Sequence, residues 1–266
     1  MQEIDKQRKM KESLQAFQRL LEIMNELREK CPWDKEQSFE SLRANTIEEV
    51  YELSDAILKK DTTEIKKELG DILLHVVFYS KIASETNSFD IAEVCNTLSD
   101  KLIFRHPHVF KQEELNSSVK VEESWEKIKL KEKGGNKTVL SGVPKSLPSM
   151  IKAYRIQDKV RNVGFDWEEK EQVWDKVEEE LNEFKVELYA MNKERMTAEL
   201  GDLFFSLINA ARLYKINPDE ALERTNQKFM NRFSYLESKT ISKGQSLSDM
   251  SLEEMEKIWQ EAKSQE

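Results

Sequence analysis

Five acidic residues recur in this sequence with the same internal spacing, 131 positions apart. The first set is Glu48, Glu49, Glu52, Glu68 and Asp71, and the second is Glu179, Glu180, Glu183, Glu199 and Asp202. Helical residues three or four apart share a face, so two antiparallel helices would bring four carboxylates of each set together. Like charges at that distance repel, and a hard divalent cation with oxygen ligands, Mg²⁺ or Mn²⁺, compensates them. The duplicated pattern therefore predicts two metal sites.

The alternative is an acidic helix face in water, which is the usual state of such a pattern. Three expectations favour metal. We expect Glu48, Glu49, Glu52 and Asp55 to lack the lysine that a solvated face normally offers four residues on. The E-x-x-D pairs lead into apolar runs, where unpaired carboxylates are costly. Gly70 and Gly201 lie within the predicted helices, where glycine costs about 0.5–1 kcal/mol relative to alanine, which indicates close approach by a neighbouring helix or ligand.

Helical periodicity defines the elements that must position these carboxylates. An amphipathic helix with apolar residues from Phe17 to Leu27 is broken at residues 31–34, and a second helix is expected to begin near Thr46. Residues 59–63 read as a turn with Asp61 or Thr62 as the cap of the next helix. That helix runs to Tyr79 and is apolar almost all round, which predicts a central position. A further helix is expected over residues 91–104.

The same order of elements begins again after residue 148. Breaker residues are densest at 131–148, which predicts domains at 1–130 and 149–266 with a linker between them. Residues 150–163 match the first helix, and Phe165-Asp166-Trp167 stands where Pro32-Trp33-Asp34 stood. The predicted fold is all-α, with two tandem helical-bundle domains that arose by duplication. Few Gly and Pro residues (7 and 5) support a helical chain.

Basic and aromatic residues also recur. Lys101 and Arg105 correspond to Lys228 and Arg232, and Trp125 corresponds to Trp259. A metal-bound carboxylate cluster followed by Lys-x-x-x-Arg and Trp suits a nucleoside triphosphate, because the cations hold phosphates and the indole stacks on a base. The alternative, exposed cations and a core tryptophan, stays open for each residue alone. Glu48, Lys101, Arg105 and Trp125 would form a second possible site.

Composition and the remaining motifs restrict the class of protein. The net charge of −9 disfavours binding to nucleic acid or to an anionic membrane. Cys31 and Cys95 have no zinc-site spacing, and the N-terminal residues lack an apolar signal core, so a cytoplasmic location without a membrane span is expected. P-loop, GxGxxG, HExxH and GxSxG motifs are absent from the sequence. His75, His106 and His108 have no counterparts in the second half, so we expect structural roles for them.

The sequence resembles the MazG family of nucleoside triphosphate pyrophosphohydrolases over nearly its whole length. The resemblance rests on residues 31–37 (CPWDKEQ), 105–110 (RHPHVF), 162–167 (NVGFDW), both acidic motifs and their tandem arrangement. It implies an all-α fold that assembles as a homodimer. It also implies Mg²⁺-dependent hydrolysis of NTPs to NMP and pyrophosphate with broad base and sugar tolerance, in nucleotide-pool housekeeping or stress. Standard, damaged and signalling nucleotides all stay open as substrates.

Carried over by position, the resemblance assigns roles to individual residues. The metal ligands would be Glu180, Glu183, Glu199 and Asp202, and the nucleotide would be surrounded by Lys176, Glu179, Lys228, Arg232 and Trp259. Glu49, Glu52, Glu68 and Asp71 match the metal motif in the first half. Lys176 lies one helical turn before Glu180, whereas the first half has Asn45 at that position. The second half is therefore predicted to be the main active site, with Glu179 orienting or deprotonating water, and turnover in the first half stays open.

Two rival interpretations remain. A carboxylate-bridged di-metal oxidase is also helical and acidic, but it expects Glu-x-x-His pairs, and this chain has Glu-x-x-Asp. A non-catalytic helical module could instead bind a basic partner through its acidic faces. Carboxylates beside apolar residues argue against such a module.

Overall fold

A computed structural model describes residues 2–110, 128, 138–167, 169–242, 244 and 246–265 of the chain. Within these residues all regular elements are helices, and no strand occurs, which confirms the all-α prediction. The chain forms two compact units, Met1–Glu114 and Leu115–Glu266. The expected linker at 131–148 stays a prediction, because residues 131–137 lie outside the described part. None of the described helices has the length and apolar content of a membrane span.

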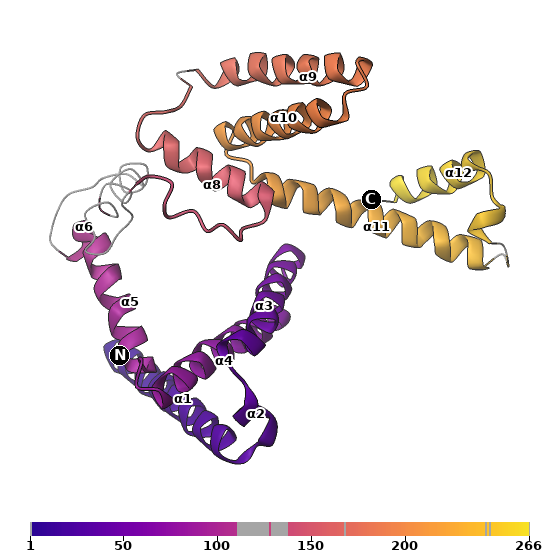
Figure 1. Ribbon diagram of the computed structural model, residues 1–266. Coiled ribbons are helices and arrows are strands. Elements are labelled where there is room, and N and C mark those ends of the chain that lie inside the picture. Colours follow the sequence, from indigo (N-terminus) through magenta and orange to yellow (C-terminus); the bar gives the residue numbers. More distant parts are fainter. Residues whose placement is uncertain are drawn as a thin grey trace. The chain divides into compact units, whose positions relative to one another are not determined.

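The first unit is built around a pair of long helices. Its elements are α1 (Gln2–Lys30), α2 (Pro32–Glu36), α3 (Phe39–Lys59), α4 (Thr62–Glu85), α5 (Ile91–Arg105) and α6 (Pro107–Phe110). Helix α4 packs against α3, α1 and α5, and these helices are drawn in indigo to magenta in Figure 1. Met24, Leu42, Val77 and Phe78 form the buried core where α1, α3 and α4 meet.

The second unit repeats the helix pair. Its elements are α8 (Ser149–Arg161), the short 3₁₀ turn η1 (Lys170–Gln172), α9 (Val173–Tyr189), α10 (Lys193–Leu213), α11 (Pro218–Ser242), η2 (Leu247–Asp249) and α12 (Leu252–Lys263). Figure 1 shows α9 and α10 side by side and α12 folded back on α11. Val173, Val177 and Ala210 form the buried contact between α9 and α10.

The turns that reverse the chain between the paired helices are equivalent. Lys60 has a positive φ of 58° after α3, and Asp61 caps α4 by accepting bonds from the backbone N–H of Thr63 and Glu64. Met191 (φ 54°) and Asn192 do the same between α9 and α10, again displaced by 131 positions. The Asp or Asn cap accepts hydrogen bonds from helix N–H groups that have no intrahelical acceptor. The two turns therefore fix where α4 and α10 begin. The predicted cap at Asp61 is confirmed.

One of two expectations about the helices of the first unit is wrong. Helix α3 begins at Phe39 rather than near Thr46, because Ser38 and Ser41 form a reciprocal capping box that starts the helix two turns earlier. The central position expected for α4 is confirmed by its packing against α3, α1 and α5, although Leu69, Leu73 and Val76 are 52%, 39% and 39% exposed. The apolar character of α4 therefore extends beyond the face that packs within its own unit.

Candidate active site

In each unit the paired helices bring three of the predicted carboxylates together. Oxygen atoms of Glu49 from α3 and of Glu68 and Asp71 from α4 all lie within 4.8 Å of one another. We call these three residues the first acidic group. Glu180 from α9 and Glu199 and Asp202 from α10 meet the same criterion and form the second acidic group. The i, i+3 spacing on one helix and a single carboxylate from the other produce both groups, as the sequence predicted.

The remaining predicted acidic residues lie at the edge of these groups. Glu48, Glu52, Glu179 and Glu183 are exposed and are not among the residues that meet within 4.8 Å. Glu52 and Glu183 are nevertheless close enough to act electrostatically, because each raises the pKa of a group member, Glu49 or Glu199. The fourth carboxylate of each predicted ligand set therefore borders the group.

Burial distinguishes the acidic groups from a solvated helix face. Glu68 is 3% exposed and Glu180 is 7% exposed. The Glu68 Oε2 atom is fully buried and has no hydrogen-bond partner among the described residues. A buried carboxylate oxygen without a donor is costly. A cation bound among these oxygens would remove that cost.

Electrostatics within the groups follows from the crowding of like charges. Desolvation, followed by the charges of Asp71, Glu52, Glu68 and Glu48, raises the pKa of Glu49. Desolvation and then Glu183, Asp202, Glu180 and Glu187 raise the pKa of Glu199. Both shifts mean that the ionised form is disfavoured where the carboxylates meet.

These shifts predict how metal affinity depends on pH. A metal ion binds the ionised carboxylate, so Mn²⁺ affinity should fall on acidification at a pH above the ordinary carboxylate pKa of 4.5. Without metal the sign is opposite: the folded state binds protons more tightly than the unfolded state, so stability falls as pH rises from 4.5 through the raised pKa. Mn²⁺ titrations and thermal melts over a pH series measure both. If Mn²⁺ affinity begins to fall only at or below pH 4.5, the raised pKa values of Glu49 and Glu199 would be contradicted.

In each unit a lysine contacts the acidic group. In the first unit this lysine is on the second helix of the pair, and in the second unit it is on the first helix of the pair. Lys176 on α9 lies 2.7 Å from Glu180 and 2.9 Å from Glu179, and these bonds raise its pKa. Lys67 on α4 lies 2.9 Å from Glu68, which likewise raises the pKa of Lys67. Helix spacing gave no sign of the Lys67 contact, because adjacent residues do not share a helix face. The first half therefore has a basic residue at its acidic group, although not at the position of Lys176.

The residues of the second half that were predicted to contact phosphate and base lie on α11 and α12, which follow α9 and α10. Lys228 and Arg232 are on α11 and Trp259 is on α12. The Arg232 guanidinium lies 5.8 Å from the centre of the Trp259 ring, which also packs at 4.9 Å against Phe229. The structure thus brings Arg232 and Trp259 together, on helices that follow the pair bearing the second acidic group. In the first half, Lys101 and Arg105 lie on α5, and Trp125 lies outside the described residues.

Three further expectations can be compared with the structure. Asp55 does have a lysine partner, Lys59 at 2.6 Å and four residues on, so that part of the argument against a solvated face was wrong. A Cβ atom on Gly70 or Gly201 would meet no atom within 4 Å, so close approach by a neighbouring helix of the same unit is also wrong. His75 is 7% exposed, which confirms its expected burial.

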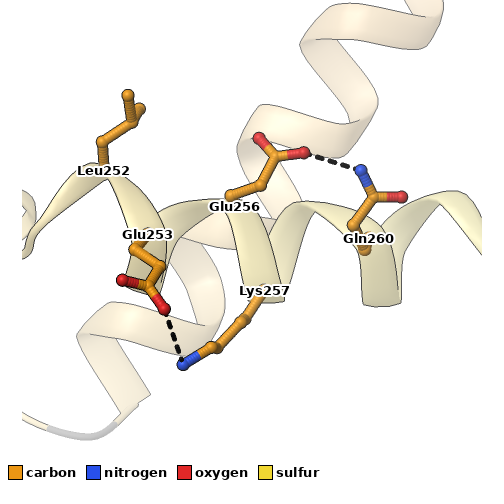
Figure 2. Close-up of a pocket in the computed structure, with 5 residues that line it drawn as sticks. All are labelled: Leu252, Glu253, Glu256, Lys257 and Gln260. Atoms are coloured by element: carbon orange, nitrogen blue, oxygen red, sulfur yellow. Dashed lines mark hydrogen bonds and ion pairs between the residues drawn. The ribbon is translucent and has the colours of Figure 1, made fainter.

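A surface hollow on α12 is separate from both acidic groups. Figure 2 shows that Leu252, Glu253, Glu256, Lys257 and Gln260 line it, all from one helix. Its polar side chains pair with each other: Lys257 with Glu253 at 3.6 Å, and Gln260 with Glu256 at 2.6 Å. Because these groups satisfy one another on an exposed helix face, the hollow offers little to a ligand.

Comparison with known proteins shows that both halves of the chain match one family. The model of the MazG nucleotide pyrophosphohydrolase domain matches the chain twice, at residues 37–110 and 168–236. A nucleoside triphosphate pyrophosphohydrolase of Escherichia coli (strain K12) is 39% identical over 260 residues, covering 95% of this chain and 99% of that protein. Thermotoga maritima has a nucleoside triphosphate pyrophosphohydrolase/pyrophosphatase MazG that is 41% identical over 257 residues (96% and 98%). The uncharacterized protein YabN of Bacillus subtilis is 45% identical over 254 residues, which are 94% of this chain and 52% of YabN. This chain belongs to the MazG family of nucleotide pyrophosphohydrolases and carries the family's domain twice.

Proposed function

We propose that the chain hydrolyses nucleoside triphosphates to NMP and pyrophosphate, with Mg²⁺ held by the second acidic group. The observation that carries this proposal is the meeting of partly buried carboxylates from two helices within 4.8 Å, in a chain of this family. The names of the E. coli and T. maritima relatives support the reaction. A broad range of standard and altered NTPs, in nucleotide-pool housekeeping or stress, is part of the proposal.

The donor set fits a hard divalent cation. Glu180, Glu199 and Asp202 offer only oxygen ligands, and Glu183 borders them, so Mg²⁺ is the expected ion and Mn²⁺ a substitute. Glu49, Glu68 and Asp71, with Glu52 beside them, offer the same set in the first half, where a bound cation would satisfy the Glu68 Oε2 atom that has no partner among the described residues. When bound, the ion would neutralise phosphate oxygens and lower the pKa of a coordinated water.

The surrounding residues supply the other parts of the reaction. Lys176 would release Glu180 and bind a phosphate oxygen, and Lys228 and Arg232 would hold the rest of the triphosphate while Trp259 stacks on the base. Glu179, next to Lys176, would accept the proton of the attacking water. Attack on the α-phosphorus breaks its bond to the bridging oxygen, and pyrophosphate leaves with its charge stabilised by Lys and Arg.

We also propose a homodimer, on the basis of apolar surface beside the acidic groups. Besides the three exposed residues of α4, helix α10 exposes Leu200, Phe204 and Phe205 by 36%, 55% and 43%. Apolar side chains that recur on the helices of both acidic groups are typical of a surface that another chain covers. A second copy of this chain is the proposed partner. The net charge of −9 supports the absence of direct nucleic-acid binding, and two unpaired cysteines are compatible with the proposed cytoplasmic location.

Thermal melting separates this function from the rival interpretations. Mg²⁺ with a non-hydrolysable NTP should raise the melting temperature clearly, because both bind only the folded chain. Glu180→Gln should remove most of that shift, whereas Glu253→Gln, on the exposed face of α12, should leave it unchanged. An acidic module for a basic protein partner would give no shift. A di-metal oxidase is disfavoured because neither acidic group includes a histidine among the described residues.

A further inference from the structure

A hydrogen-bonded hub joins α3 to α4 beside the first acidic group. The Thr46 hydroxyl on α3 lies 3.1 Å from Nδ1 of His75 and 2.6 Å from the hydroxyl of Tyr79, both on α4. It also donates to the carbonyl of Leu42, one turn earlier in its own helix, at 2.9 Å. His75 is buried, and Thr46 and Tyr79 are half-buried. One hydroxyl therefore connects two helices through two directional contacts, while a third contact holds it within its own helix.

The single proton of the Thr46 hydroxyl fixes the direction of these bonds. Because Thr46 donates to Leu42, it must accept from both Tyr79 O–H and His75 Nδ1–H. The neutral His75 ring then carries its proton on Nδ1. Tyr79 is held in turn by a parallel ring contact with Phe39 at 5.5 Å. The hub thus has one consistent arrangement of donors and acceptors, which makes it sensitive to the relative placement of the two helices.

The hub lies next to the carboxylates on both helices. Thr46 precedes Glu49 by three residues on α3, and His75 follows Asp71 by four residues on α4, so each pair shares a helix face. The separation along each helix is about one turn, roughly 5.4 Å. Repulsion among the three carboxylates pushes α3 away from α4 at the acidic group. The hub opposes that movement at the neighbouring turn.

The second unit holds its helix pair in a different way. At the displacement of 131 positions, Val177, Ser206 and Ala210 stand where Thr46, His75 and Tyr79 stand. All three are buried, and the Ser206 hydroxyl donates to the carbonyl of Leu203 within its own helix. Apolar contact between Val177 and Ala210 is not directional. Lys67 and Lys176 do not replace the hub, since each lysine lies on the same helix as the carboxylates it contacts.

From these contacts we infer that Thr46, His75 and Tyr79 are positioning residues that hold Glu49 against Glu68 and Asp71 and so set the metal affinity and ion selectivity of the first acidic group. The inference rests on the proposed metal-binding function. Outer residues that orient metal ligands typically change affinity by 10–100-fold. A fixed oxygen spacing also favours the small, strictly octahedral Mg²⁺ and Mn²⁺ over Ca²⁺, which accepts longer and more variable contacts.

The test measures Mn²⁺ binding to the first group in the full chain. Glu199→Gln and Asp202→Asn first disable the second group, and free Mn²⁺ is then followed by electron paramagnetic resonance, with Ca²⁺ as competitor. Thr46→Val should weaken Mn²⁺ binding about tenfold or more and reduce the preference for Mn²⁺ over Ca²⁺. Thr46→Ser restores the hydroxyl and should restore both. Valine carries a methyl group where threonine carries its hydroxyl, so Thr46→Val removes the hydrogen bonds and keeps the branched shape of the side chain.

Two further variants keep the result interpretable. Tyr79→Phe removes only the hydroxyl and keeps the ring against Phe39, so it should weaken Mn²⁺ binding even if Thr46→Val fails to fold. Thr225→Val is the matched control and should change nothing, because among the described residues the exposed Thr225 hydroxyl bonds to the carbonyl four residues earlier in its own helix and to no other group. Unchanged Mn²⁺ affinity and selectivity in Thr46→Val, or an equal loss in Thr46→Ser, would overturn the inference. If the Glu199→Gln and Asp202→Asn chain with its first group intact binds no Mn²⁺, the proposed metal site of the first half is overturned; the hydrolysis proposed for the second acidic group is tested separately, by pyrophosphate release from the unaltered chain.

Discussion

Replacement of Glu180 by Gln together with Asp202 by Asn is expected to lower the rate of Mg²⁺-dependent pyrophosphate release by about 10³-fold or more. The two changes remove one proposed ligand from α9 and one from α10, which leaves Glu199 as the remaining carboxylate of the second acidic group. Metal ions contribute several kcal/mol to the stabilisation of a phosphoryl transition state, and each 1.36 kcal/mol is tenfold in rate. Both replacements keep side-chain size. Relief of like-charge repulsion offsets the loss of the Glu180–Lys176 ion pair, so the folded chain should be close to the parent in stability without metal.

The matched control makes the same changes in the first acidic group. Glu49→Gln with Asp71→Asn alters two half-buried carboxylates, one on α3 and one on α4. We expect most pyrophosphate release to survive, because the second half alone has Lys176 at its acidic group. Loss of activity in this control, with activity retained in the Glu180 and Asp202 variant, would move the main site to the first half. Retention of activity in a chain that carries both pairs of replacements would contradict the carboxylate–metal account.

Replacement of Arg212 by Met is expected to destabilise the second unit by about 2–3 kcal/mol. The Arg212 side chain is 3% exposed. Its Nη1 and Nη2 atoms donate to the carboxylate of Asp166. Its Nε and Nη2 atoms donate to Oδ1 of Asn209. Breaking a buried ion pair typically costs about 3–5 kcal/mol, and the value is reduced here because Asp166 keeps 20% exposure. Arg212 ties the loop before α9 to the end of α10, so denaturant titration should show the loss in the free energy of unfolding.

Arg195 provides the control for charge and helix. It also lies on α10 and contacts one carboxylate, Glu187 at 3.4 Å, but it is 69% exposed. An exposed pair contributes at most about 1 kcal/mol, so Arg195→Met should have a small effect. Equal losses for Arg195→Met and Arg212→Met would mean that burial of the Asp166 pair does not determine its contribution.

The sequence was sufficient for those parts of the site that depend on helix periodicity. The i, i+3 spacing predicted that Glu68 and Asp71 would meet, and the repeat predicted the same for Glu199 and Asp202. The cap at Asp61 followed from the hydrogen-bonding chemistry of its side chain. These features are local, so the identity and spacing of a few residues determine them.

Features that depend on three-dimensional contact were predicted less well. The start of α3 was predicted too late, because the Ser38–Ser41 capping box was not recognised as the beginning of the helix. The contact between Lys67 and Glu68 depends on the path of a long flexible side chain, which helix spacing does not describe. The hub at Thr46 joins residues 29 and 33 positions apart, and no local pattern links them. The apolar pattern of α4 also does not distinguish side chains that pack inside the unit from Leu69 and Leu73, which lie at its surface.

Identification of the products formed from an NTP in the presence of Mg²⁺ tests the central claim most directly. Phosphorus NMR of the reaction of the intact chain should show NMP and pyrophosphate in equal amounts, with neither product formed when a chelator removes the metal. Formation of NDP and orthophosphate would place the cleaved bond elsewhere in the triphosphate. No Mg²⁺-dependent turnover of any NTP would contradict the proposal that the paired acidic helices form a hydrolytic site.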